Sequence, residues 1–372
     1  MKPFLPFTRP AIDDASIAAV AQVFRSGQLA SGPKVLAFEA ALCKYLGGER
    51  HLRVMTSATA GLEMALEVAG IGAGDEVIVP AMSFAASANV VARVGAKPVF
   101  VDIDLHSRNI DIAKVPAAIT PRTRGIMPVH FAGLAVDMDG LYDIARRHKL
   151  RVVEDAAHAI GTRYKGKLIG SFGDLVVFSF HPNKNMTSIE GGAISSGDAN
   201  AAALFEQYRF HGIKKNADGE VDVMFPGAKS NLADVAAQVG IDQLARLDAF
   251  NARRAQLAQR YFEEFGDYKQ VVLPARGDDG HAWHMFQVLI DFAAHQLKRV
   301  TFQKLMAERG IGVGHHYPSI PGLTYYRSQG YREADWPVAA RVGREIVTLP
   351  LFPAMQDEDV TRVVQAIREV LG

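Results

Sequence analysis

Strand-like and helix-like segments alternate through the first two thirds of this 372-residue chain, and this alternation limits the folds that it can adopt. Short apolar runs typical of strands lie at residues 76–80, 97–102, 125–129, 151–155, 174–180 and 192–195. Segments with helical spacing lie between or before them, at 57–69, 84–94 and 138–150. Apolar runs of strand length separated by helices indicate a mostly parallel sheet covered by helices on both faces. In such sheets ligands bind at the carboxyl ends of the strands.

The last third of the chain has a different pattern. Residues 231–247 and 249–265 are predicted helices, and we expect the second to bridge into a smaller domain. That domain should contain a strand at 286–292, a helix at 297–309 and a closing amphipathic helix at 357–371. The sequence therefore predicts a large domain over residues 1–250 and a small C-terminal domain over residues 251–372.

Charge and composition argue against several classes of protein. The chain has 41 basic and 40 acidic residues, a net charge of +1, whereas nucleic-acid and membrane-surface binders usually carry a basic excess. No run approaches the roughly 20 apolar residues of a membrane helix, and the N-terminus lacks a continuous apolar signal core. The single cysteine, Cys43, has apolar neighbours and is expected to be a core thiol. We expect a cytoplasmic protein without nucleic-acid or membrane partners.

Three chemically useful groups lie at the ends of predicted elements. Asp155 ends the apolar strand 151–155, and Lys184 follows the apolar run 175–178. Ser57 is a natural N-cap for the helix that follows it, so the free amides of residues 58–60 would attract a phosphate group. An amine, a carboxylate at a strand end and an anion-binding helix start are the groups that pyridoxal phosphate requires.

The chemistry of this cofactor explains why each group is needed. Its ring acts as an electron sink when the pyridine nitrogen is protonated, and a carboxylate such as Asp155 keeps that proton in place. A lysine such as Lys184 forms a Schiff base when its free amine is populated. Alternation along the strand places Glu154 on the opposite face from Asp155. His158 is a candidate partner for the ring oxygen, and Phe84 for stacking on the ring.

Each of these residues also has a simpler interpretation. Ser57 could cap an ordinary helix, and Asp155 could be a helix-cap or loop carboxylate. A lone histidine such as His158 is more often a structural hydrogen-bonding group, Phe84 could belong to the core, and Lys184 could be a surface lysine. Single residues therefore do not identify a cofactor site.

The order and spacing of the motifs resemble the DegT/DnrJ/EryC1/StrS sugar aminotransferase family, within the fold type I pyridoxal phosphate enzymes. The resemblance covers nearly the whole chain and rests on residues 26–33, 57–62, 74–80, 98–102, 154–158, 170–174, 179–185, 316–317 and 348–353. It implies a mostly parallel sheet of the seven-stranded type, flanked by helices, with a smaller C-terminal α/β domain.

The resemblance also implies roles by position. Lys184 matches the lysine that forms the Schiff base and then moves protons, and Asp155 matches the partner of the pyridine nitrogen. The remaining cofactor contacts that it implies are Ala58, Thr59 and Ser179 at the phosphate, Phe84 on the ring face and His158 near the ring oxygen.

Members of this family work as homodimers in which each subunit completes the other's active site. The segment 227–232 matches the donated loop, so Lys229 and Asn231 would reach the cofactor of the partner subunit. Many members have Asn and Arg at these two positions. The Lys and Asn version is more similar to enzymes that make 4-amino-4-deoxy-arabinose on a uridine nucleotide, although Ser230 stands where those enzymes carry an aromatic residue.

The expected activity is a ping-pong transamination through Lys184. By family analogy the amino donor is L-glutamate and the acceptor is a nucleotide-linked ketosugar, for cell-surface polysaccharide, lipopolysaccharide or antibiotic sugar synthesis. His181, Lys229, His316 and Tyr317 are the predicted contacts of the sugar nucleotide. Lys229 is a candidate because a diphosphate requires positive charge.

Three alternatives follow from the same residues. A sugar dehydratase of the same fold carries His where Lys184 stands, so the lysine favours transamination. A non-catalytic regulator that binds pyridoxal phosphate should add a DNA-binding helix pair or a basic face, and the sequence contains neither. A pyridoxal phosphate aminotransferase acting on a non-sugar keto or aldehyde substrate is disfavoured only by the family resemblance.

Overall fold

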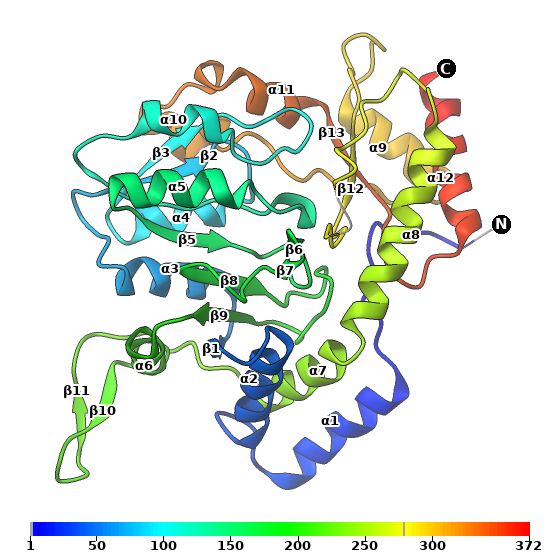
Figure 1. Cartoon of the computed structure of the whole chain (residues 1–372). Helices are drawn as coiled ribbons and strands as arrows, with labels where there is room; N and C mark the ends of the chain where they lie inside the picture. Colours follow the sequence, from blue (N-terminus) through cyan, green and yellow to red (C-terminus); the bar gives the residue numbers. More distant parts are fainter. Residues whose placement is uncertain (1–2, 278–279) are drawn as a thin grey trace.

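The computed structural model describes residues 3–277 and 280–372, and a seven-stranded sheet forms its centre (Figure 1). In spatial order the strands are β1 (His51–Met55), β9 (Gly192–Ser196), β8 (Leu175–Ser179), β5 (Arg151–Asp155), β4 (Thr123–Ile126), β2 (Glu76–Pro80) and β3 (Lys97–Val101). β9 is antiparallel to both of its neighbours, and the other neighbouring pairs are parallel. The predicted mostly parallel sheet is therefore confirmed.

Helices cover both faces of the sheet, as the continuous apolar strands predict. One face packs against α3 (Ala58–Val68), α4 (Ala86–Arg93) and α6 (Ala199–Tyr208), and the other against α2 (Pro33–Tyr45), α5 (Met138–His148) and α7 (Asp234–Leu244). Successive residues of a strand point to opposite faces. On β2, Val77 and Val79 accordingly join the α3 side, whereas Ile78 joins the α5 side.

The strand predicted at 125–129 ends earlier than expected. The apolar run 125–129 predicts a strand through Val129, but β4 ends at Ile126. Pro128 has no backbone N–H to donate, so the ladder of hydrogen bonds cannot continue through it. The chain still runs between β2 and β5 after Ile126. Met127 donates to the carbonyl of Ile78, and Val129 forms an isolated bridge with Asp155.

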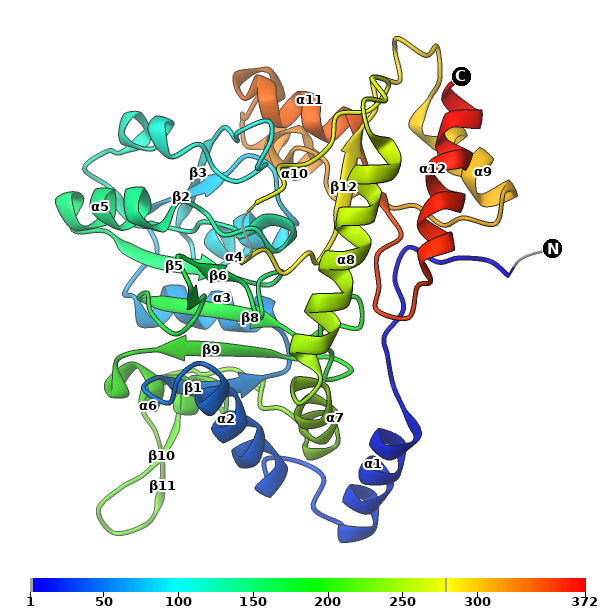
Figure 2. The ribbon, with the colours of Figure 1, turned by 45° about the vertical axis from the view of Figure 1, so that its right-hand side comes forward.

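A second unit contains most of the last third of the chain. Its apolar cluster draws on α8 (Leu247–Phe265), β12 (Phe286–Leu289), α9 (Arg299–Glu308), β13 (Ile346–Leu349) and α12 (Asp357–Leu371). β12 and β13 pair antiparallel, and α8 runs from the end of α7 into this unit (Figure 2). The helices predicted at 249–265, 297–309 and 357–371 are confirmed to within two residues. The strand predicted at 286–292 begins as expected but ends at Leu289.

Segments from each end of the chain pack against the unit formed by the other end. Leu5, near the N-terminus, packs in the cluster of the second unit. Residues of α10 (Thr324–Ser328) and α11 (Pro337–Glu345) pack back on the α3 side of the large sheet, where Tyr326 and Val342 are buried. The division at residue 250 remains a prediction.

The remaining elements lie at the periphery. The helix α1 (Asp14–Ser26) packs against α7, and the hairpin of β10 (Ile213–Lys215) and β11 (Val221–Val223) projects from the body of the molecule (Figure 1). The short strands β6 (Arg163–Tyr164) and β7 (Lys167–Leu168) form another hairpin. Among the described residues, no helix combines the length and the apolar character needed to span a membrane.

The strand directions decide where a site can form. β5 and β8 are parallel neighbours, and both point toward α8 and the second unit (Figure 1). The helix α3 begins nearby, directly after Ser57, whose Oγ accepts a hydrogen bond of 3.1 Å from the amide of Ala60. The carboxyl ends of two central strands and the amino end of a helix therefore meet beside the junction of the two units.

Gly61 allows α3 to lie close to the sheet. A Cβ at this position would be 2.8 Å from Met55 Sδ and 2.9 Å from Val177 Cγ1. We expect Gly61→Ala to lower the free energy of unfolding by about 1–2 kcal/mol, because overpacking outweighs the helix preference of alanine. Urea unfolding measures this change. Adding Val177→Ala should relieve the clash, so strictly additive effects of the two substitutions would contradict this packing explanation.

Candidate active site

A cavity of about 280 Å³ lies at the carboxyl ends of β5 and β8. It brings together most of the residues that the sequence singled out. Its lining includes Ala58, Thr59, Phe84, Asp155, His158, Ser179, His181, Lys184, His316 and Tyr317. These residues come from widely separated segments, so their convergence supports a single site.

Lys184 lies in the turn that follows β8, where its amide donates to the carbonyl of His181 at 2.9 Å. Partial burial lowers the pKa of Lys184 to about 8, although the nearby charge of Asp155 opposes the shift. At pH 7 a pKa of about 8 leaves about one amine in ten unprotonated, whereas an ordinary lysine has almost none. The site therefore contains a lysine that is prepared to act as a nucleophile.

Asp155 ends β5 and is buried with a solvent exposure of 4%. Ser87 Oγ donates to its Oδ2 at 2.7 Å, and the amide of Ala157 donates to Oδ1 at 3.1 Å. Burial raises the pKa of Asp155 above 3.8, and these two donors together with Lys184 and His130 only partly offset the effect. A further cation beside this carboxylate would be stabilised strongly, as a protonated ring nitrogen requires.

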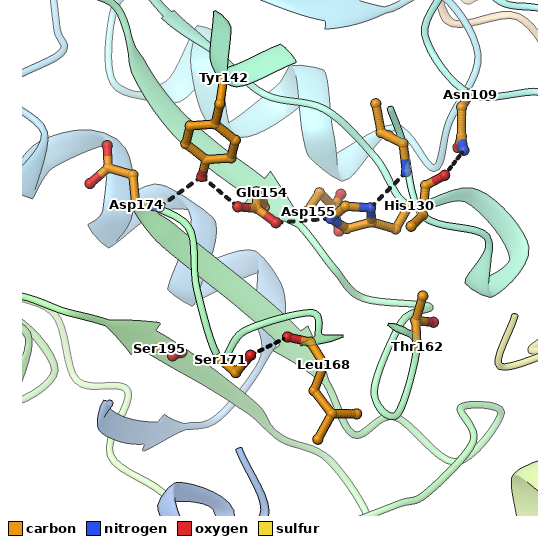
Figure 3. Close-up of polar contacts among 12 residues, drawn as sticks. Asn109, His130, Tyr142, Glu154, Asp155, Thr162, Leu168, Ser171, Asp174 and Ser195 are labelled. Atoms are coloured by element: carbon orange, nitrogen blue, oxygen red, sulfur yellow. Dashed lines mark hydrogen bonds and ion pairs between the residues drawn. The ribbon is translucent and has the colours of Figure 1, made fainter. Parts of the chain in front are cut away.

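Glu154 points to the opposite face of β5, as the strand alternation predicts (Figure 3). Its carboxylate accepts from Tyr142 Oη at 2.6 Å and lies 3.0 Å from His130 Nε2. The amide of Val136 donates to His130 Nδ1, so Nε2 carries the ring proton and donates to Glu154. Tyr142 Oη in turn accepts from the amide of Asp174. This buried network holds β5 in place behind Asp155.

The start of α3 forms one end of the cavity. The first amides of a helix have no partner within it, and those of Ala58 and Thr59 belong to this set. A Cβ on Gly192 would lie 2.5 Å from the amide nitrogen of Ala58, so only glycine allows β9 to pass this close. Ser179 pairs with Gly192 in the sheet, which brings its hydroxyl to the same end. Amides, hydroxyls and the helix dipole together suit a phosphate.

His158 and Phe84 also line the cavity. The amide of Ala132 donates to His158 Nδ1 at 3.3 Å, so Nε2 carries the proton and lies 3.4 Å from Tyr317 Oη. Burial, with Lys184 and His316 nearby, holds the pKa of His158 well below 6.5, so the ring is neutral. Phe84 is 56% exposed, and its ring centroid lies 5.6 Å from that of Tyr317.

The predicted substrate residues divide into two groups. His181, His316 and Tyr317 line the cavity. His316 Nδ1 lies 3.0 Å from Thr348 Oγ1, and its pKa falls to about 4, first because of burial. Within residues 3–277 and 280–372, the cavity lining does not include Lys229 or Asn231. In this chain these two side chains contact each other, and Lys229 Nζ lies 4.5 Å from the centre of the Phe210 ring.

Four polar residues of the site were not predicted from the sequence. Ser83, Asn183 and Glu190 line the cavity, and Ser87 holds Asp155. Asn183 directly precedes Lys184 within the motif 179–185, which was a usable signal, and Glu190 lies just beyond that motif. Ser87 lies in the first turn of α4, four residues after Ser83, and only the tertiary structure brings it to β5.

The donor set fits pyridoxal phosphate along the whole cavity. Amides and hydroxyls at α3 suit its phosphate, the buried carboxylate of Asp155 suits its ring nitrogen, and the amine of Lys184 suits its aldehyde. The neutral His158, with a proton on Nε2, suits an acceptor oxygen on the ring.

Comparisons with known proteins agree with this fit. The model of the DegT/DnrJ/EryC1/StrS aminotransferase family matches residues 10–368. The spore coat polysaccharide biosynthesis protein SpsC of Bacillus subtilis is 39% identical over 99% of this chain and 97% of its own. Spr1654 of Streptococcus pneumoniae in its PLP form is 31% identical, with a TM-score of 0.91 over 99% of this chain and 100% of its own.

DesV of Streptomyces venezuelae, solved with a ketimine intermediate, is 34% identical, with a TM-score of 0.91 over 99% of this chain and 98% of its own. The family match and these similarities extend over nearly the full length of the chain. The chain therefore belongs to the DegT/DnrJ/EryC1/StrS aminotransferase family, as a pyridoxal phosphate-dependent sugar aminotransferase of fold type I.

Proposed function

We propose that the protein transfers the amino group of L-glutamate to a nucleotide-linked ketosugar in two half reactions. The observation that carries the proposal is the convergence of Lys184, Asp155 and the start of α3 in one cavity of a sugar aminotransferase. The name of SpsC, a spore coat polysaccharide biosynthesis protein, supports a product that is used in polysaccharide or related sugar synthesis.

The cofactor would be held along the length of the cavity. Ala58, Thr59 and Ser179 would bind its phosphate, Phe84 would lie on its ring, and His158 Nε2 would donate to the ring oxygen. When bound, pyridoxal phosphate supplies an electron sink for the carbon that carries the transferred amino group.

Asp155 would keep the ring nitrogen protonated. Its carboxylate is fixed by Ser87 and by the amide of Ala157, and the Glu154 network holds the strand from behind. Burial raises the pKa of Asp155, and a cation at the ring nitrogen would return it toward its ordinary value. Binding of the cationic ring and ionisation of Asp155 would therefore reinforce each other.

Lys184 would be the acid and base of both half reactions. In the first, its Nζ would take a proton from the α-carbon of the amino donor and pass it to the cofactor. In the second, it would take a proton back from the cofactor and give it to the sugar carbon that receives the nitrogen. A pKa of about 8 suits both directions near neutral pH, since efficient proton transfer requires a group whose pKa is close to the working pH.

The acceptor sugar would contact His181, His316 and Tyr317 at the cavity lining. The cavity measures about 280 Å³, near the lower end of ligand pockets, so the cofactor would fill much of it. The nucleotide of the acceptor would therefore extend out of the cavity, where a positively charged side chain could bind its diphosphate.

We also propose a homodimer in which Lys229 and Asn231 complete the partner's site. These residues lie outside the cavity lining of their own chain, within the part that the structure describes. Large apolar side chains on α1 and α2 support an interface between copies, because Ile17, Phe24 and Leu36 are 58%, 59% and 64% exposed.

A cytoplasmic location is part of the proposal. Cys43 is the only cysteine of the chain, so an internal disulfide is impossible. The thiol is half-buried at the edge of the α5-side cluster and donates to the carbonyl of Arg50. A free thiol of this kind suits a reducing compartment.

Lys184→Ala should abolish covalent attachment of the cofactor and lower the transamination rate by at least about 10²-fold, because Lys184 is the only lysine in the cavity lining of the described residues. Borohydride reduction followed by peptide mass mapping should find the cofactor on Lys184 in the wild-type protein. The exposed-lysine control Lys167→Ala should keep both properties. Full turnover by Lys184→Ala would refute the assigned role.

The amine of Lys184 should titrate at about pH 8 in the cofactor-free protein. The ammonium is unreactive, so the rate of labelling by an amine reagent should rise with pH and level off above pH 8. In Asp155→Asn the midpoint should move lower, because the negative charge of Asp155 favours the ammonium form. Mass spectrometry of the Lys184 peptide follows the reaction. A midpoint near 10.5 would contradict the burial of the amine.

A substrate panel should distinguish a sugar nucleotide from a plain keto acid. We expect glutamate consumption with uridine- or thymidine-diphosphate ketosugars, and a kcat/KM at least about tenfold lower with pyruvate or simple aldehydes, because these lack the contacts beyond the cavity. The reverse order of rates would favour an aminotransferase of non-sugar substrates.

A further inference from the structure

Asn185 follows Lys184 directly, yet its side chain faces away from the cavity. It is buried with 4% exposure and is absent from the cavity lining, whereas its neighbours Asn183 and Lys184 belong to that lining. A buried amide must satisfy two N–H groups and a carbonyl oxygen within the protein. The partners that it uses show what this residue holds in place.

Both donors of the amide are used. Asn185 Nδ2 donates to Asn251 Oδ1 at 2.7 Å and to the carbonyl of Ala282 at 2.8 Å. A carbonyl can only accept, so the orientation of the Asn185 amide follows from chemistry. The orientation of Asn251 follows in the same way, because its Nδ2 donates to the carbonyl of Ile160 at 3.2 Å.

The oxygen of the amide fixes a histidine. Asn185 Oδ1 lies 3.0 Å from His284 Nδ1, and since Oδ1 can only accept, Nδ1 carries the ring proton. The ring of His284 packs on that of His158, with centroids 4.5 Å apart and planes 30° apart. The amide of His284 also donates to the carbonyl of Ala132, whose own amide donates to His158 Nδ1.

These contacts join three parts of the fold. Asn251 lies in the first turns of α8, which connects the large sheet to the second unit (Figure 2). Ala282 and His284 precede β12 of that unit. Asn185 belongs to the turn after β8 of the large sheet. One amide therefore ties the backbone next to Lys184 to the junction of the two units.

We propose that Asn185 is a positioning residue that fixes Lys184 and His158 relative to each other, an inference that rests on the role proposed above for Lys184. Without the amide, the lysine turn loses its connection to α8, and His284 loses the bond that orients its ring against His158. Proton transfer requires donor and acceptor within hydrogen-bond distance, and a displacement of about 1 Å can cost about 10²-fold in rate.

The first test compares Asn185→Ala with Ser195→Ala. Ser195 is a matched control because its buried hydroxyl donates to the carbonyl of Gly170 and accepts from Arg50, away from the cavity lining. Both variants should have a lower melting temperature. Only Asn185→Ala should lower kcat, by at least about tenfold, with little change in the KM for glutamate.

The second test does not depend on turnover. In cofactor-free protein, the pH midpoint of Lys184 labelling should rise above about 8 in Asn185→Ala, because a loosened turn lets water reach the ammonium. In Asn185→Asp it should rise further, since a carboxylate replaces a donor beside the lysine turn. Ser195→Ala should keep the wild-type midpoint.

The third test asks whether Asn185 acts through α8. Asn251→Ala should reproduce part of the loss in kcat, and the double variant with Asn185→Ala should cost little more than Asn185→Ala alone, as members of one network do. Wild-type kcat and midpoint in both Asn185 variants would overturn the inference, as would effects equal to those of Ser195→Ala. Absence of cofactor on Lys184 in the wild-type protein would instead overturn the proposed function, and this inference with it.

Discussion

The site depends on one geometric constraint, which is that β5 and β8 run side by side and end at the same edge of the sheet. The parallel pairing brings Asp155 and the turn containing Lys184 into one cavity. His316 and Tyr317, from the last third of the chain, line the same cavity, and both charged groups are partly shielded from water. Burial then acts on them in opposite senses, raising the pKa of the acid and lowering the pKa of the amine.

The period of two along β5 separates two carboxylates that are adjacent in the chain. Asp155 faces the cavity, whereas Glu154 faces α5 and is held by Tyr142 and His130. The two residues have the same chemistry, and each carboxylate accepts one hydrogen bond on each oxygen. Only Asp155 also lines the cavity, where a cation can approach it, and that difference is what an electron-sink cofactor needs.

Local sequence patterns predicted most of the fold. Strands such as 76–80 and 151–155 and helices such as 357–371 were predicted at or near their observed bounds, because apolar periodicity and capping residues are local signals. The early end of β4 at Ile126 was missed, although Pro128 carried the signal. The return of α11 to the large sheet could not be predicted, since packing across about 200 residues leaves no local pattern.

The sequence by itself determined which chemical groups are present and in what order: a lysine and an aspartate after apolar strands, and a serine at a helix start. The tertiary structure decided which of them meet. It brought Ser87 to Asp155 and Asn251 to Asn185. Within the described residues, it also left Lys229 outside the cavity lining of the same chain. Hydrogen bonds between distant segments depend on how helices pack against the sheet, and spacing along the chain does not encode that packing.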